Sequence, residues 1–221
     1  SLSMADEING VPKYILAVNE TKKMLDIIPQ EKSVGLRIIG LTIDENIIKY
    51  IKNPNELCKA TKLVSPIKPY NKSDIIQNLN NIHPLGTTPL VYAVDKAINY
   101  DFSNNTDRKH IILITDGIDG CNGDICSYIS NLNRLRNDVT IDVISIGVNN
   151  QELSQLKCFS NGTSGILINV TTPYDFRHAY NKIFTPNIEK ADNIINIEDK
   201  KAVEKINDNI IYKNFIFQFD N

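Results

Sequence analysis

Residues 109–123 read KHIILITDGIDGCNG, and this stretch decides how the rest of the sequence is interpreted. Its apolar run, Ile111 to Ile114, is short and rich in β-branched residues, and it stops at Thr115, Asp116 and Gly117. These features predict a buried parallel strand rather than a helix. Ligands of open α/β sheets bind at the carboxyl ends of the strands. We therefore expect Asp116 to stand at a ligand-binding edge.

The composition limits the classes of function. The chain has 221 residues, which is enough for one α/β domain with a sizeable core. A net charge of -2, with no basic stripe between aromatic residues, gives no reason to expect a nucleic-acid partner. No apolar run approaches the roughly 20 residues that a membrane-spanning helix needs. We expect neither nucleic-acid binding nor membrane insertion by this chain.

Outward from residues 109–123, strand-like and helix-like segments alternate. This alternation predicts an α/β fold with a doubly wound, mostly parallel sheet flanked by helices. Residues 1–184 form the predicted domain body, and the polar, aperiodic residues 185–209 are interpreted as a linker or a peripheral tail. The predicted strands span 34–43, 63–67, 111–115, 139–147 and 165–170, and the predicted helices span 12–28, 74–82, 90–97, 129–135, 152–158 and 174–184.

Strand character returns at residues 210–221, which read IIYKNFIFQFDN. Phe215, Phe217 and Phe219 alternate along one face, and the run ends on Asp220. An isolated strand at the end of a chain is unusual unless the sheet has a vacancy for it. We therefore expect residues 210–221 to complete the sheet as a central strand.

The two ends of the chain together spell a motif. Read from the last residue into the first, the sequence gives Asp220-x-Ser1-x-Ser3 directly after a hydrophobic strand. At this point the chain resembles the von Willebrand factor A domain family, whose first strand ends in D-x-S-x-S. In that family a G-T-P loop and a strand-end T-D-G complete a metal-ion-dependent adhesion site. The similar parts in this chain are residues 86–89, GTTP, and 115–117, TDG.

The order of these parts departs from the family, because the first family strand comes last in this chain. We interpret this order as a circular permutation in which residues 210–221 supply the first family strand. The resemblance covers residues 1–184 and 210–221 and leaves only 185–209 outside it. It implies the Rossmann-like fold of the family.

The resemblance also implies a divalent cation, Mg²⁺ or else Mn²⁺ or Ca²⁺, held by Asp220, Ser1, Ser3, Thr88 and Asp116. Mg²⁺ prefers hard oxygen ligands and readily keeps bound water. The carboxylates are expected to bind directly or through water and to orient the hydroxyls. Because hydroxyl ligands carry no charge, the open position attracts an acidic group. The expected function is a metal-dependent adhesion or interaction module, not an enzyme, whose protein ligand presents Asp or Glu.

The same residue types also suit ordinary local roles. Ser1 and Ser3 suit a helix cap, Thr88 a turn, and Asp116 an Asp-Gly turn. A metal-dependent phosphohydrolase using Asp116 or Asp220 is one alternative function, and a structural domain with a vestigial site is another. The hydrolase lacks support because the sequence places no Lys or Arg beside the carboxylates and has no Gly-rich phosphate loop.

Asp6 and Glu7 follow the serines at a spacing similar to that of a second cation site in integrin β-subunit domains. Two carboxylates near a helix start are equally well explained by the helix dipole. We keep both interpretations.

The four cysteines indicate the compartment. Cys121 and Cys126 flank a loop short and turn-rich enough to close as a disulfide, and Asp119 and Asp124 are interpreted as bystanders in it. Zinc is less well supported, because the other two cysteines have no paired ligand nearby and the three histidines are scattered. An even number of cysteines favours an oxidising compartment, with free thiols in a cytosolic protein as the alternative.

The loop ITDGIDGCNGDIC, which begins in the predicted strand over 111–115, is similar to a T-D-G-x-x-x-C-x-G-D-x-C loop of some bacterial von Willebrand A domains. Those relatives are typically exported or linked to the surface. The resemblance therefore implies a Cys121–Cys126 bridge and an extracellular, periplasmic or cell-surface location. It leaves Cys58 and Cys158 unassigned.

Overall fold

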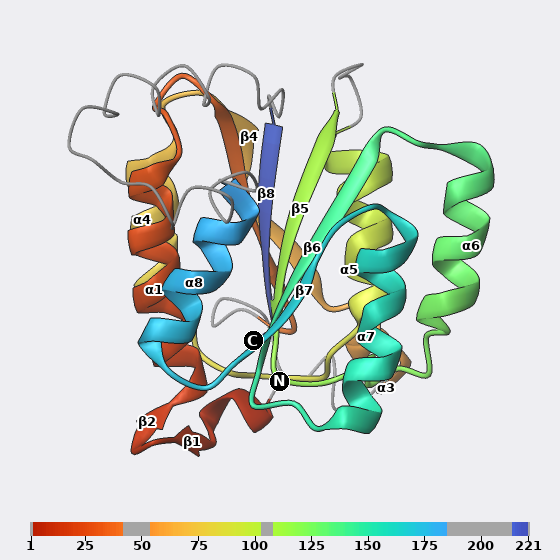
Figure 1. Cartoon of the computed structure of the whole chain (residues 1–221), viewed down its shortest axis with the longest axis horizontal. Coiled ribbons are helices and arrows are strands. Elements are labelled where there is room, and N and C mark those ends of the chain that lie inside the picture. The colour runs from red at the N-terminus through yellow and green to blue at the C-terminus, as the bar shows by residue number, and fades with distance from the viewer. Residues whose placement is uncertain (1, 42–53, 103–107, 185–213, 221) are drawn as a thin grey trace, which may run out of the picture.

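A six-stranded sheet forms the centre of the molecule, in the strand order β4-β3-β8-β5-β6-β7 (Figure 1). The computed structural model describes residues 2–41, 54–102, 108–184 and the strand 214–220. The strands of this sheet are β3 (Ser33–Ile39), β4 (Thr61–Lys68), β5 (Lys109–Thr115), β6 (Val139–Ile146), β7 (Leu167–Val170) and β8 (Asn214–Asp220).

The strand β8 lies between β3 and β5 and pairs in parallel with both. β5 and β7 also pair in parallel with β6, whereas β4 pairs antiparallel with β3 at one edge. Ile39 lies opposite Asp220, and Ile114 lies opposite Phe219. The backbone of Asp220 therefore ends level with Thr115, the residue that precedes Asp116.

Helices cover both faces of the sheet (Figure 1). One face packs on α1 (Lys13–Ile27), α4 (Lys72–Leu79) and α8 (Pro173–Phe184). The other packs on α5 (Leu90–Lys96), α6 (Ile125–Leu135) and α7 (Asn150–Gly162). The remaining described elements are short: η1 (Leu2–Ala5), β1 (Glu7–Ile8), β2 (Val11–Pro12), α3 (Pro54–Leu57) and η2 (Ala97–Asp101).

The apolar sequence of β5 explains its place in the interior. All seven of its residues are buried, as expected for a strand that is covered on both faces. Ile112 and Ile114 join the core on the α1 side, and Ile111 and Leu113 join the core on the α5 side. This division follows from the alternation of side chains along a strand.

The predicted elements agree with an α/β fold, with differences at their ends. The strand predicted over 34–43 corresponds to β3, which ends at Ile39, and residues 42–43 lie outside the described part of the chain. The predicted linker, 185–209, also lies outside it. Within the described residues, every helix is too short or too polar to cross a bilayer.

The predicted Cys121–Cys126 bridge is wrong. Cys58 is bonded to Cys121 and Cys126 to Cys158, with Cα–Cα distances of 5.5 and 5.0 Å. The physical reason is that α6 begins inside the loop, where the side chain of Asp124 caps the helix. Cys126 thus lies on the first turn of α6, which packs against α7. The pairing of all four cysteines also argues against zinc and free thiols.

Replacing Cys126 and Cys158 together by Ser should lower the free energy of unfolding by about 2–4 kcal/mol, because the bond closes a loop between residues 32 apart. Urea denaturation in an oxidising buffer measures this change. Peptide mapping without reduction provides the control. A peptide pair joined through Cys121 and Cys126 would contradict the assigned connectivity.

Candidate functional site

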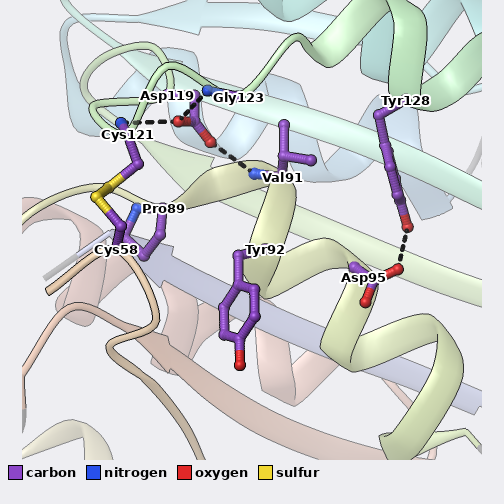
Figure 2. A pocket seen from close by; sticks show the side chains of 9 residues that line it. All are labelled: Cys58, Pro89, Val91, Tyr92, Asp95, Asp119, Cys121, Gly123 and Tyr128. Carbon is purple, nitrogen blue, oxygen red and sulfur yellow. Dashed lines mark hydrogen bonds between the residues drawn. A yellow bond between two sulfur atoms is a disulfide. The ribbon is translucent and has the colours of Figure 1, made fainter. Parts of the chain in front are cut away.

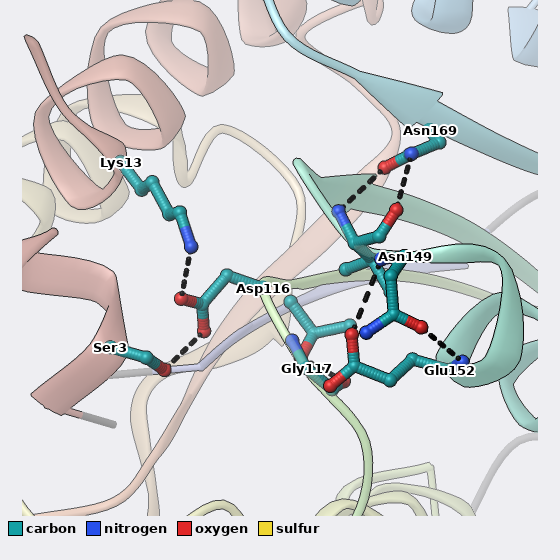
Figure 3. A network of polar contacts seen from close by, with 9 residues as sticks. Ser3, Lys13, Asp116, Gly117, Asn149, Glu152 and Asn169 are labelled. Carbon is teal, nitrogen blue, oxygen red and sulfur yellow. Dashed lines mark hydrogen bonds and ion pairs between the residues drawn. The ribbon is translucent and has the colours of Figure 1, made fainter. Parts of the chain in front are cut away.

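Asp116 follows the last residue of β5, and its side chain is fully buried. A buried carboxylate is costly unless it is paired and hydrogen-bonded. Ser3 Oγ donates a hydrogen bond of 2.9 Å to Asp116 Oδ1, and Lys13 Nζ lies 3.1 Å from Asp116 Oδ2 (Figure 3). Both carboxylate oxygens are therefore stabilised by polar groups from the N-terminal segment.

A short hairpin brings Ser3 and Lys13 to the same carboxylate. Ser3 lies in η1 and Lys13 begins α1, with β1 and β2 between them. The hairpin turns at Asn9 and Gly10, which both have positive φ angles, 52° and 77°. The backbone N–H of Lys13 also donates to the carbonyl of Asp6, at 3.0 Å. This turn folds the chain back, so that residues ten positions apart contact Asp116 from one side.

The contact between Ser3 and Asp116 has the chemistry that a cation site needs. A serine hydroxyl has one proton and two lone pairs, and Ser3 gives the proton to Asp116 Oδ1. A hydroxyl oxygen can also accept, and the residue is exposed. Serine oxygen is a hard ligand of the kind that Mg²⁺ prefers. The observed pair thus fits a site in which a carboxylate orients a hydroxyl ligand.

Thr88 lies in the loop before α5 and is buried. Its carbonyl accepts hydrogen bonds from the N–H groups of Gly120, at 2.9 Å, and Leu90, at 3.0 Å. Gly120 belongs to the loop that follows Asp116, so this bond joins the two predicted site loops. Gly86 has a φ of +89°, a conformation that a side chain would strain. The Thr88 loop is therefore fixed against the loop after Asp116.

The structure brings together some of the predicted site residues. Ser3 and Asp116 are in direct contact, and the Thr88 loop is bonded to the loop after Asp116. The strand β8 ends at Asp220, so the backbone of Asp220 lies at the same edge of the sheet. Ser1 lies outside the described residues.

The predicted second cation site at Asp6 and Glu7 stays a prediction. Both residues are exposed. In the described parts of the chain, no three His, Cys, Asp or Glu side chains gather as a metal-binding cluster. The main predicted site does not depend on such a cluster, because three of its five side chains are hydroxyls.

Lys13 corrects the expectation that no basic residue stands beside the carboxylates. The Asn9-Gly10 dipeptide signals a tight turn in the sequence, and both residues have the positive φ angles of such a turn. The sequence does not show that this turn brings Lys13 to Asp116, because the two residues are 103 positions apart. Asp119 is also more than a bystander. Its carboxylate accepts hydrogen bonds from the N–H groups of Val91, Cys121 and Gly123, at 2.8, 2.8 and 2.9 Å.

The neighbouring strand ends are also held by side-chain hydrogen bonds (Figure 3). Asn169 Oδ1 accepts from the hydroxyl of Ser145 and from the N–H of Val148. Asn149 caps α7 and forms a reciprocal capping box with Glu152. These contacts connect β6, β7 and α7, which lie on the other side of β5 from β8. They hold the neighbouring part of the sheet edge in place.

The fold and this site edge define a class of protein. The family model of the von Willebrand factor type A domain matches residues 42–185. The chain therefore belongs to the von Willebrand factor type A domain family.

Two relatives come from Bacillus subtilis (strain 168). The chain is 26% identical over 186 residues to the uncharacterized protein YwmC, covering 83% of this chain and 77% of that protein. It is 23% identical over 181 residues to the uncharacterized protein YwmD, covering 81% of this chain and 79% of that protein. Neither name specifies a ligand.

Solved structures support the fold alone. The conserved hypothetical protein BatB from Bacteroides thetaiotaomicron is 13% identical, with a TM-score of 0.60 over 82% of this chain and 91% of that one. The SpRpn10 VWA domain is 15% identical, with a TM-score of 0.55 over 79% of this chain and 87% of that one. The family and the two disulfides favour an extracellular location.

Replacing Lys13 by Met should lower the free energy of unfolding by about 2–4 kcal/mol, because the buried Asp116 charge loses its ion-pair partner. Urea denaturation with EDTA present measures the change without a cation. The control is Lys157→Met on an exposed turn of α7, which should change the free energy by less than about 0.5 kcal/mol. Equal stability of the two variants would show that the Lys13 pair contributes nothing.

Proposed function

We propose that this domain is a metal-dependent protein-binding module. A divalent cation is held by Asp220, Ser1, Ser3, Thr88 and Asp116, and it binds an acidic residue of a protein partner. Von Willebrand A domains are commonly protein-interaction modules. The observation that carries the proposal is the hydrogen bond from Ser3 to the buried Asp116, because it orients a hydroxyl as a ligand.

The donor chemistry suits Mg²⁺, Mn²⁺ or Ca²⁺. All five side chains offer hard oxygen atoms, and three of them are neutral. Lys13 already balances part of the charge of Asp116. In this proposal Asp116 orients Ser3 and retains bound water, and the hydroxyls contact the cation. The cation keeps enough positive charge to attract a carboxylate of the partner.

The position of β8 supports the proposed circular permutation. Its backbone ends at Asp220, opposite Ile39 and level with Thr115. Ser3 reaches the same edge through Asp116. In this proposal the last strand supplies the aspartate of the D-x-S-x-S motif, and the first residues supply its serines.

The proposed location is extracellular, periplasmic or on the surface of a bacterial cell. Disulfides persist in oxidising compartments, and both bonds of this chain join segments far apart in sequence. A partner with an exposed Asp or Glu would meet the domain there.

One observation favours the alternative of a metal-dependent phosphohydrolase. The ammonium of Lys13 lies 3.1 Å from Asp116, where a basic group could contact a phosphoryl oxygen. That ammonium is paired with Asp116, and the chain has no Gly-rich phosphate loop, so the binding module is the better supported function.

Isothermal titration calorimetry with Mg²⁺ tests the proposal. The parent chain should bind one Mg²⁺, and Thr88→Ala and Asp220→Ala should each weaken binding by about 10- to 100-fold, because each removes an oxygen that holds or orients the ion. Asp26→Ala, at an exposed position on α1, is the control and should bind like the parent.

Absence of Mg²⁺, Mn²⁺ and Ca²⁺ binding by the parent would overturn the proposal. Turnover of p-nitrophenyl phosphate by the parent, lost in Asp116→Asn, would favour the hydrolase instead.

A further inference from the structure

A pocket of about 360 Å³ opens beside the Cys58–Cys121 disulfide (Figure 2). Tyr92 and Asp95 of α5 and Tyr128 of α6 contribute to its lining. The described lining residues include two aspartates and no Lys, Arg or His. Among the described residues, the lining of the pocket is therefore largely apolar and aromatic, and its charged side chains are acidic.

The pocket adjoins the candidate metal site. Pro89, which lines it, directly follows Thr88. Cys121 and Gly123 also line it and belong to the loop that follows Asp116. The hydrogen bond from the N–H of Gly120 to the Thr88 carbonyl joins the loops that carry these residues. A partner protein bound at the metal site could thus place a second, nearby side chain of its own in this pocket.

The two aspartates play different parts. The Asp119 carboxylate accepts hydrogen bonds from backbone N–H groups, as Figure 2 shows, and connects its own loop to the start of α5. Asp95 is half-buried, and its Oδ1 accepts from Tyr128 Oη, at 3.3 Å, and from Asn99 Nδ2, at 2.8 Å. Among the described residues, no hydrogen bond or ion pair uses Asp95 Oδ2. Asp95 therefore has a carboxylate oxygen available to a ligand.

Two tyrosine rings line the pocket, and one of them is already in contact with a cation of the chain. Positive groups bind favourably over the faces of tyrosine rings. The ammonium of Lys96 lies 3.8 Å from the ring centroid of Tyr100 and 5.2 Å from that of Tyr92. Lys96 therefore already brings a positive charge to the Tyr92 ring, so a ligand cation in the pocket relies on Asp95 and on the ring of Tyr128. A longer cationic side chain could bury its methylene stem against the apolar wall and present its charge to Asp95.

We propose that this pocket binds a Lys or Arg side chain of the protein partner whose carboxylate binds at the metal site. The inference rests on the proposed function and specifies the partner further, as a surface that carries an acidic and a basic residue close together. The charge of the lining commits the pocket to a cation rather than to a neutral apolar side chain.

Binding of n-butylguanidinium tests the pocket without a cation in the metal site. In NMR spectra of ¹³C-tyrosine-labelled protein with EDTA, n-butylguanidinium should shift the signals of Tyr92 and Tyr128. The neutral probe n-butylurea, which has the same shape, should bind about five- to tenfold more weakly. Asp95→Asn keeps the oxygen acceptor for Tyr128 and should weaken n-butylguanidinium by the same factor. Asp26→Asn is the control and should change nothing. Equal binding of the two probes, or an unchanged Asp95→Asn variant, would overturn the inference.

Selection of peptides from a random phage library in Mg²⁺ tests the link to the metal site. Peptides that bind the parent should carry an acidic residue and a basic residue within a few positions. Peptides selected on the Asp95→Asn variant should no longer share a basic residue. Peptides selected on the Thr88→Ala variant should no longer share an acidic residue. An acidic residue without a basic one on the parent would overturn this inference alone, whereas a basic residue without an acidic one would overturn the proposed function.

Discussion

The parallel pairing of β8 with β3 and β5 is the constraint on which the rest of the structure depends. A central strand supplies hydrogen bonds to two neighbours, and without it β3 and β5 would each expose an edge in the middle of the sheet. The helices on both faces pack across this junction, and the edge where β8 and β5 end also holds Asp116. The fold therefore unites the last residues of the chain with the segments that carry the candidate site.

At that edge, the burial of one charge organises several segments. The Asp116 side chain is fully buried, and the hairpin after η1 places Ser3 and Lys13 on its two oxygens. On the other side of the site, backbone hydrogen bonds to Asp119 and to the Thr88 carbonyl hold the loops before α5 and α6 together. The contacts of Asp116 and of Asp119 thus fix the positions of the segments that form the candidate site.

The sequence predicts features that depend on local pattern. The run at Ile111–Ile114 is apolar on both faces, so a buried strand could be predicted with Asp116 at its end. The disulfide pairing could not, because it depends on where α6 begins and on how α6 packs against α7, not on the five-residue spacing of Cys121 and Cys126. The Asn9-Gly10 dipeptide signals a turn, but the contact of Lys13 with Asp116 joins residues 103 positions apart and depends on the tertiary fold.

Amide hydrogen exchange of β8 tests the central claim most directly. A strand paired on both sides has its backbone N–H groups in hydrogen bonds, and such groups exchange only when the sheet opens. We predict that the amides of 215–219 exchange as slowly as those of Ile111–Ile114 in β5. Exchange of 215–219 at the rate of an unstructured peptide, while β5 and β6 remain protected, would contradict the central position of β8.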